Sequence, residues 1–125
     1  MKATELMIGD WVCLKDDTKC EFPLKVDGIL TDDISLEGEG FLGGVDGLIR
    51  PIPITPEILE KNGWKRNKIY MDMKAADYIN FSWTDKCDET LFQNRYYMCD
   101  CEYVHTLQHA LRLCGLNELA DNFKI

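Results

Sequence analysis

The sequence lacks any long hydrophobic run. Its uninterrupted apolar stretches are far shorter than the roughly 20 residues that a membrane-spanning helix needs. Residues 1–11 also lack the apolar core of a signal peptide. We therefore expect a cytoplasmic protein with no membrane partner.

The sequence has no excess of basic residues. It contains 14 Lys and Arg against 22 Asp and Glu, which gives a formal net charge of −8. Because nucleic-acid binding relies on a positive surface, we expect no nucleic-acid partner. The acidic excess leaves two explanations open, namely solubility and an acidic decoy that occupies a basic protein.

Several motifs of catalysis and metal binding are missing. The six cysteines (Cys13, Cys20, Cys87, Cys99, Cys101 and Cys114) include no CxxC pair, and in the cytosol we expect them to be reduced thiols. The glycine-rich segment 38–47 lacks the GK[ST] of a phosphate loop. We predict that this segment is a mobile hairpin tip.

The 125 residues predict one α+β domain with a β-rich half, residues 5–54, and a helix-meander-helix half, residues 55–125. The first half predicts a small bent β-sheet or SH3-like partial barrel. We expect its strands at residues 11–15, 22–30, 34–37 and 48–54. Gly28 is expected at a bulge, and Pro51 and Pro53 confine the last strand to an edge.

Residues 55–63 predict a short helix. Thr55 is a good N-cap, Pro56 suits the first helical position and Gly63 suits a left-handed stop. An antiparallel meander follows, with strands at residues 69–73, 78–83 and 91–99.

A packed C-terminal helix completes the predicted fold. We place it at residues 102–114, with Asp100 as N-cap, and expect its apolar face to lie on the meander. Asn117 is expected to cap a final short turn over residues 118–122.

The segment 99–109 combines thiols and imidazoles. Cys99, Cys101, His105 and His109 would satisfy tetrahedral zinc. In a thiol enzyme, Cys101 near a helix N-terminus would pair with one of the histidines. The alternative is that the cysteines are buried hydrophobes and the histidines lie on a solvated helix face.

Three apolar or aromatic residues are candidates for contact with a protein partner. Phe41 and Leu42 lie in the glycine-rich segment, where they either fold back onto the core or stay exposed. Tyr97 is expected to point outward from its strand. An uncovered sheet edge at residues 48–52 or along the meander would permit a homodimer.

Three segments, residues 6–12, 52–64 and 103–111, carry a resemblance that spans nearly the whole chain. They resemble, in the same order, a group of small uncharacterised proteins of Bacteroides-type gut bacteria and their phages. The resemblance implies a bacterial or phage origin and no particular activity. In that group Asn often occupies the position of His109, whereas His105 is typical.

The sequence therefore predicts a non-catalytic accessory or protein-interaction module with an unidentified protein partner and no cofactor. The alternatives are a zinc-binding protein and a thiol-dependent enzyme, both with the site at residues 99–109.

Overall fold

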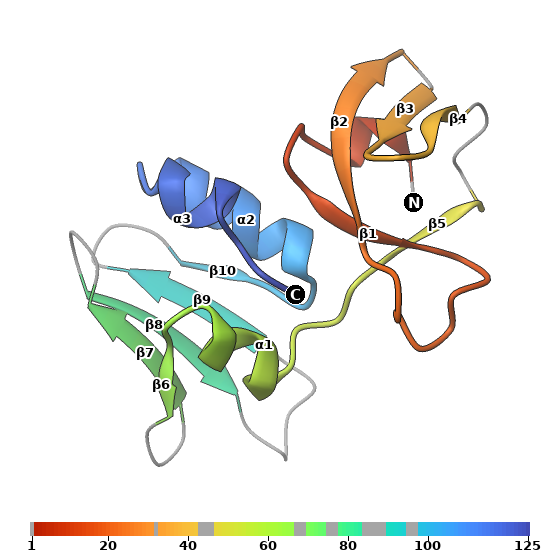
Figure 1. Cartoon of the computed structure of the whole chain (residues 1–125). Coiled ribbons are helices and arrows are strands. Elements are labelled where there is room, and N and C mark those ends of the chain that lie inside the picture. The colour runs from red at the N-terminus through yellow and green to blue at the C-terminus, as the bar shows by residue number, and fades with distance from the viewer. Residues whose placement is uncertain are drawn as a thin grey trace. The chain divides into compact units, whose positions relative to one another are not determined.

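The computed structural model describes residues 2–31, 33–42, 47–66, 70–74, 78–83, 90–94 and 98–125. It divides into two compact units, Met1–Ile52 and Pro53–Ile125. Strands and helices both occur, the strands in antiparallel sheets, which confirms the α+β class (Figure 1).

The first unit contains a five-stranded antiparallel sheet with the strand order β4-β3-β2-β1-β5. A short 3₁₀ turn, Ala3–Glu5, precedes it. The strands are β1 (Trp11–Leu14), β2 (Leu24–Leu30), β3 (Asp33–Leu36), β4 (Gly40–Leu42) and β5 (Ile49–Pro51). Pro51 lies in β5 at one end of this order, so the predicted edge position is confirmed.

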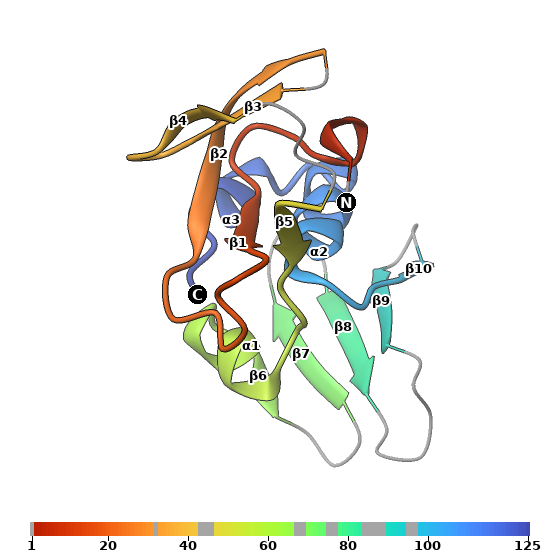
Figure 2. The same cartoon turned by 90° about the vertical axis from the view of Figure 1, so that its right-hand side faces the viewer.

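Strand β2 takes part in the pairing of both neighbours. Leu24 and Lys25 pair with β1, whereas the residues from Val26 to Leu30 pair with β3. The register shifts between Val26 and Gly28, so the expected bulge at Gly28 is confirmed. In Figures 1 and 2, β2 is accordingly a long curved strand.

The core of the first unit lies on one face of this sheet. Alternate residues of the strands point to it, as the period of a β-strand requires. Val12 and Ile34 are completely buried within it. The cluster consists of Ala3, Leu6, Val12, Val26, Ile34, Leu36 and Ile49, with Leu14, Leu24, Ile29 and Leu42 packed against it.

The glycine-rich segment differs from the prediction. Residues 40–42 form strand β4 and pair with Leu36, Ser35 and Ile34, so a loop through all of residues 38–47 is wrong. Gly38 and Gly40, at φ of 83° and 73°, form the tight turn that returns the chain to β3. Pairing with the neighbouring strand β3 therefore outweighs the low strand propensity of glycine.

Helix α1 (Pro56–Lys61) opens the second unit as predicted. Oγ1 of Thr55 accepts a hydrogen bond from the backbone N–H of Ile58 at 3.2 Å. Gly63 has a φ of 90°, and the N–H groups of Gly63 and Trp64 donate to the carbonyls of Glu60 and Leu59. This is a Schellman motif, and it explains why the helix ends at this glycine.

The predicted antiparallel meander is confirmed, with one correction. Its strands, β6 to β10, follow one another in sequence order: β6 (Lys65–Arg66), β7 (Tyr70–Lys74), β8 (Tyr78–Trp83), β9 (Thr90–Asn94) and β10 (Met98–Asp100). A single strand over residues 91–99 is wrong, because Met98 pairs back onto Gln93 and Cys99 onto Phe92. The chain therefore reverses between β9 and β10.

Two helices complete the chain and lie side by side, α2 (Val104–Leu113) and α3 (Asn117–Asp121) (Figure 1). Asp100 is not the N-cap of α2, because it ends β10, and Tyr103 occupies the cap position after bridging Pro53. Asn117 is likewise the first residue of α3 rather than its cap. Whether α2 packs on the meander stays a prediction, since the meander's side chains lie outside the described residues.

None of the helices in the described ranges has the length and apolar character that crossing a bilayer requires.

Candidate functional site

The side of the β2–β3–β4 segment opposite the core carries an apolar surface. Ile29, Ile34 and Leu42 occupy one row across the three strands and point to the core. Their neighbours in sequence therefore point outward. We call this surface the outer face, and it consists of Gly28, Leu30, Asp33, Ser35 and Phe41.

Phe41 dominates the outer face. It pairs with Ser35, which pairs with Gly28 on the next strand. A methyl group placed on Gly28 would lie 3.4 Å from Cζ of Phe41 and 3.2 Å from Cβ of Ser35. The ring of Phe41 therefore reaches across β3 to Gly28, and it explains why Ser35 is 91% buried although it faces outward (9% exposed). An aromatic ring over a strand glycine is a known stabilising arrangement.

Phe41 nevertheless stays 56% exposed, and Leu30 on the same face is 59% exposed. Leu42 instead packs against the core. Phe41 therefore stays exposed and Leu42 folds back onto the core, because neighbouring residues of a strand point in opposite directions. Tyr97 lies outside the described residues, so its outward position stays a prediction.

Several carboxylates lie on or beside the outer face. Between Lys25 and Arg50 the sequence has six acidic residues and no Lys, Arg or His. Asp27, Glu37 and Glu39 are exposed next to the outer strands, and Asp33 lies on the face itself. An apolar centre with an acidic rim complements a partner that is basic around an apolar anchor.

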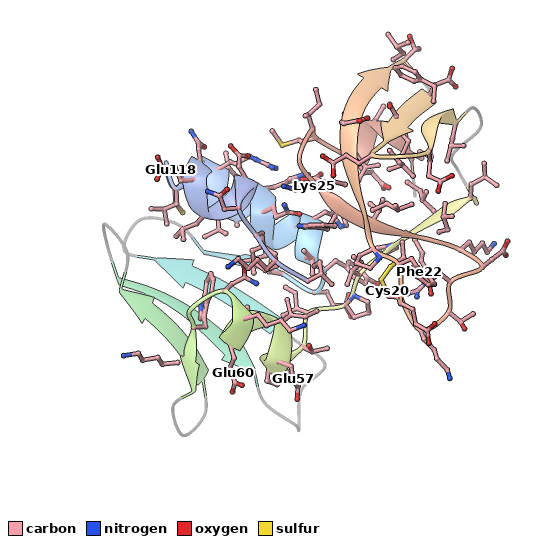
Figure 3. All side chains as sticks on the ribbon, viewed as in Figure 1. Cys20, Phe22, Lys25, Glu57, Glu60 and Glu118 are labelled. Carbon is pink, nitrogen blue, oxygen red and sulfur yellow. A yellow bond between two sulfur atoms is a disulfide. The ribbon has the colours of Figure 1, made fainter. Side chains whose placement is uncertain are left out.

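The expectation of reduced thiols is wrong for Cys13 and Cys20, which form a disulfide (Figure 3). Their Cα atoms are 5.8 Å apart, within the range that disulfides span. Cys20 lies in the loop between β1 and β2 and adopts a φ of 52°, which turns the chain back toward Cys13. Cys101 and Cys114 form no disulfide.

Asp17 organises the same loop. Its carboxylate accepts hydrogen bonds from the backbone N–H groups of Phe22 at 2.8 Å and Glu21 at 2.9 Å. These bonds, supported by the charge of Arg50, hold the pKa of the Asp17 carboxyl below its usual range. Its backbone carbonyl accepts hydrogen bonds from the N–H of Cys20 and from the Arg50 guanidinium.

Cys13, Asp17 and Cys20 also form the one metal-competent grouping of three side chains within the described ranges. One ligand atom from each lies within 4.8 Å of the others. While the two sulfur atoms are bonded to each other, however, neither is a thiolate. The group in this state is a cross-link rather than a metal centre.

The structure brings together only part of the predicted Cys99–His109 cluster. The His105 and His109 rings are edge to face, with centroids 5.7 Å apart. The Cys101 thiol instead contacts Oγ1 of Thr106 at 3.5 Å. His105 is buried, so the expectation of a solvated helix face is wrong for this residue. The side chain of Cys99 lies outside the described residues, and the four-ligand zinc site stays a prediction.

A pocket of about 220 Å³ lies at the ends of α1 and α3. Its lining offers amines, amides and apolar groups but no thiol, imidazole or carboxylate: Lys61, Asn62, Trp64, Leu119, Asn122 and Lys124. Asn62 bonds both backbone groups of Lys124, donating to its carbonyl at 2.8 Å and accepting from its N–H at 2.7 Å. This wall of the pocket therefore serves to hold the C-terminal segment in place.

Comparisons of the chain with protein-family models, with curated proteins and with solved structures find no match. The outer face and the disulfide therefore stand on their geometry alone. Sequence patterns identified Phe41 but missed Leu30, whose outward direction depends on the register after the bulge. They also missed the Cys13–Cys20 pair, because a separation of 7 residues matches no cysteine motif.

Proposed function

We propose that this protein is a non-catalytic interaction module whose outer face binds a basic protein. The observation that carries the proposal is the exposed ring of Phe41, supported on Gly28 and Ser35 beside Leu30. Aromatic side chains, including Phe, are enriched at protein–protein interfaces. A bacterial or phage origin, which the resemblance of three segments implies, is part of the proposal.

The finer fold that we infer for the first unit is an SH3-like partial barrel. In support, β2 pairs with β1 through its first residues and with β3 through the rest, with a bulge between. β1 also pairs with β5, which brings the last strand of the unit beside the first. A bulged strand shared in this way bends a small sheet toward closure.

The charge around the outer face selects the class of partner. Four described carboxylates lie on or beside the outer face, and the sequence between Lys25 and Arg50 has no basic residue to offset their charge: Asp27, Asp33, Glu37 and Glu39. They would repel nucleic acid and attract a basic protein, and they would speed association at low salt. Phe41 and Leu30 offer no hydrogen bond, so they favour an apolar anchor on the partner.

Affinity capture with matched variants tests this function. The bait is the full chain, and the source is a lysate of a Bacteroides-type gut bacterium, which the resemblance suggests. Phe41→Ser removes the anchor, and Leu113→Ser is the control, because Leu113 is 69% exposed on α2. We expect one basic protein on the wild-type and Leu113→Ser baits, at least tenfold depleted on Phe41→Ser, roughly the loss of one hot-spot residue.

A charge variant tests the contribution of the acidic rim to binding separately from that of the apolar centre. The double variant Glu37→Lys/Glu39→Lys reverses two charges of the acidic rim and leaves Phe41 in place. We expect this variant to capture less of the partner, and we expect the captured amount to depend less on the salt concentration. Circular dichroism of each variant would establish that it folds. Equal capture by wild-type and Phe41→Ser baits would contradict the proposed function. Release of a DNA-binding protein by salt alone, with Phe41→Ser unaffected, would favour an acidic decoy instead.

A further inference from the structure

We propose that Cys13 and Cys20 form a reversible thiol–disulfide exchange site that reacts with small thiols and disulfides and locks the β1–β2 loop. This inference does not rest on the proposed function. It starts from the unequal burial of the two residues. Cys13 is completely buried in β1, whereas Cys20 is half-buried in the loop. An incoming thiolate therefore reaches the sulfur of Cys20 first.

The exchange can be written with all atoms balanced. The thiolate of a small thiol attacks Sγ of Cys20, the Cys13–Cys20 bond breaks, and the electron pair leaves on Sγ of Cys13, which takes a proton from water. A second small thiolate then attacks the small-thiol sulfur of the mixed disulfide, the bond from that sulfur to Sγ of Cys20 breaks, and the electron pair leaves on Sγ of Cys20, which takes a proton from water as the small-molecule disulfide departs. In the reverse direction, the small-molecule disulfide is the oxidant and Cys13 is the resolving thiol.

The Cys13–Cys20 bond helps to hold the β1–β2 loop closed. It is closed on one side by the disulfide and on the other by Asp17, which binds Glu21 and Phe22. Lys15 and Lys19 are exposed within the closed segment. Phe22, two residues beyond Cys20, is 73% exposed (Figure 3). Breaking the disulfide leaves the Asp17 contacts and the bond from the Lys15 N–H to the Leu48 carbonyl, so the loop opens more often while the sheet persists.

Trypsin accessibility of the native full chain tests the lock. The chain is equilibrated with glutathione disulfide or with reduced glutathione and then digested briefly. We expect cleavage after Lys15 and Lys19 to be on the order of tenfold faster in the reduced chain. Cleavage after Lys61, which is exposed on α1, is the internal control and should keep the same rate.

Mass mapping tests the chemistry. With Cys13→Ala, glutathione should accumulate as a mixed disulfide on Cys20, whereas Cys20→Ala should show on the order of tenfold less on Cys13 because that residue is buried. The wild-type chain should lose two hydrogen atoms on oxidation and regain them with glutathione. Three results would each overturn the proposal: full alkylation of both cysteines after oxidation, a disulfide that glutathione never opens in the folded chain, or equal trypsin rates in both states.

Discussion

The two compact units use different side-chain groups to hydrogen-bond the backbone outside their regular strands and helices. In Met1–Ile52, carboxylates do so: Asp10 accepts the N–H of Met7 at 2.7 Å, and Asp17 accepts those of Glu21 and Phe22. In Pro53–Ile125, amides do so: Asn62 binds the backbone of Lys124, and Gln108 donates to the carbonyl of Ala120 at 3.0 Å. The pKa of Asp17 is lowered by these bonds in the folded chain, whereas amides do not titrate, so acid should loosen the first unit through the Asp17 contacts.

A second difference concerns covalent support. The first unit contains the Cys13–Cys20 disulfide, whereas the described cysteines of the second, Cys101 and Cys114, form none. In the second unit, residues next to α1 cap its two ends: Thr55 at the N-terminus and Gly63 beyond the C-terminus. The first unit should therefore respond to redox conditions as well as to pH.

The largest effect is expected in the second unit, at Gln108. This residue is completely buried, and its amide satisfies the carbonyl of Ala120. Gln108→Ala should lower the free energy of unfolding by about 3 kcal/mol, because it leaves a cavity and removes the side-chain donor of the Ala120 carbonyl, which keeps a longer backbone bond from the Phe123 N–H at 3.4 Å. Urea unfolding followed by circular dichroism measures this loss. Leu113→Ala on the same helix is the exposed control, and a loss for Gln108→Ala no larger than that of the control would contradict the role of the amide.

Reduction of the disulfide should have the next largest effect, in the first unit. A closed loop of 8 residues, from Cys13 to Cys20, corresponds to about 2.5 kcal/mol of stability in the chain-entropy treatment. The measurement is the urea midpoint with and without a phosphine reductant. A Cys13→Ala/Cys20→Ala double variant should show no shift with the reductant. An unchanged urea midpoint in the wild-type chain would show that the disulfide does not stabilise the first unit.

The cap of α1 should contribute less. Thr55→Ala removes the acceptor for the Ile58 N–H and should cost about 1 kcal/mol. Thr55→Ser keeps the hydroxyl and should stay close to the wild type in thermal unfolding. If serine fails to restore the stability, the methyl group of Thr55 rather than its hydroxyl holds the helix end.

The smallest effect is expected at Asp17 and is a pH dependence. Because the folded-state pKa of Asp17 is lowered, its stabilising contribution is fully present above the unfolded-state value near 3.8 and is lost as the pH falls through the folded value. Asp17→Asn should be less stable than the wild type at neutral pH, and the difference should shrink on acidification. Asn62→Ala, which removes an amide clamp, should lose the same amount at both pH values. If the stabilities of the wild type and Asp17→Asn change in parallel with pH, the Asp17 carboxylate is not the group that causes the pH dependence.

Local signals made part of the fold predictable. Thr55, Pro56 and Gly63 act through bonds within one helical turn, so their pattern predicted α1 correctly. The bulge at Gly28 and the edge position of Pro51 follow from the backbone limits of those residues. Strand β4 was missed because its partners in β3 rather than its own glycine-rich sequence favour the strand.

The candidate site was predictable only in part, for the same reason. Phe41 was noticed as an apolar residue in a polar segment, but its support on Gly28 depends on pairings across two strands. The disulfide depends on a loop folded around Asp17 by hydrogen bonds that no residue spacing reveals. The burial of His105 depends on the packing of α2 rather than on its sequence periodicity.

The most direct test of the central claim is amide hydrogen exchange of the full chain with and without the captured basic partner. If the outer face is the binding surface, the partner should slow exchange in residues 24–42 and leave α2 unchanged. Slower exchange confined to residues 104–113, with residues 24–42 unaffected, would contradict the assignment of the interaction to Phe41 and its neighbours.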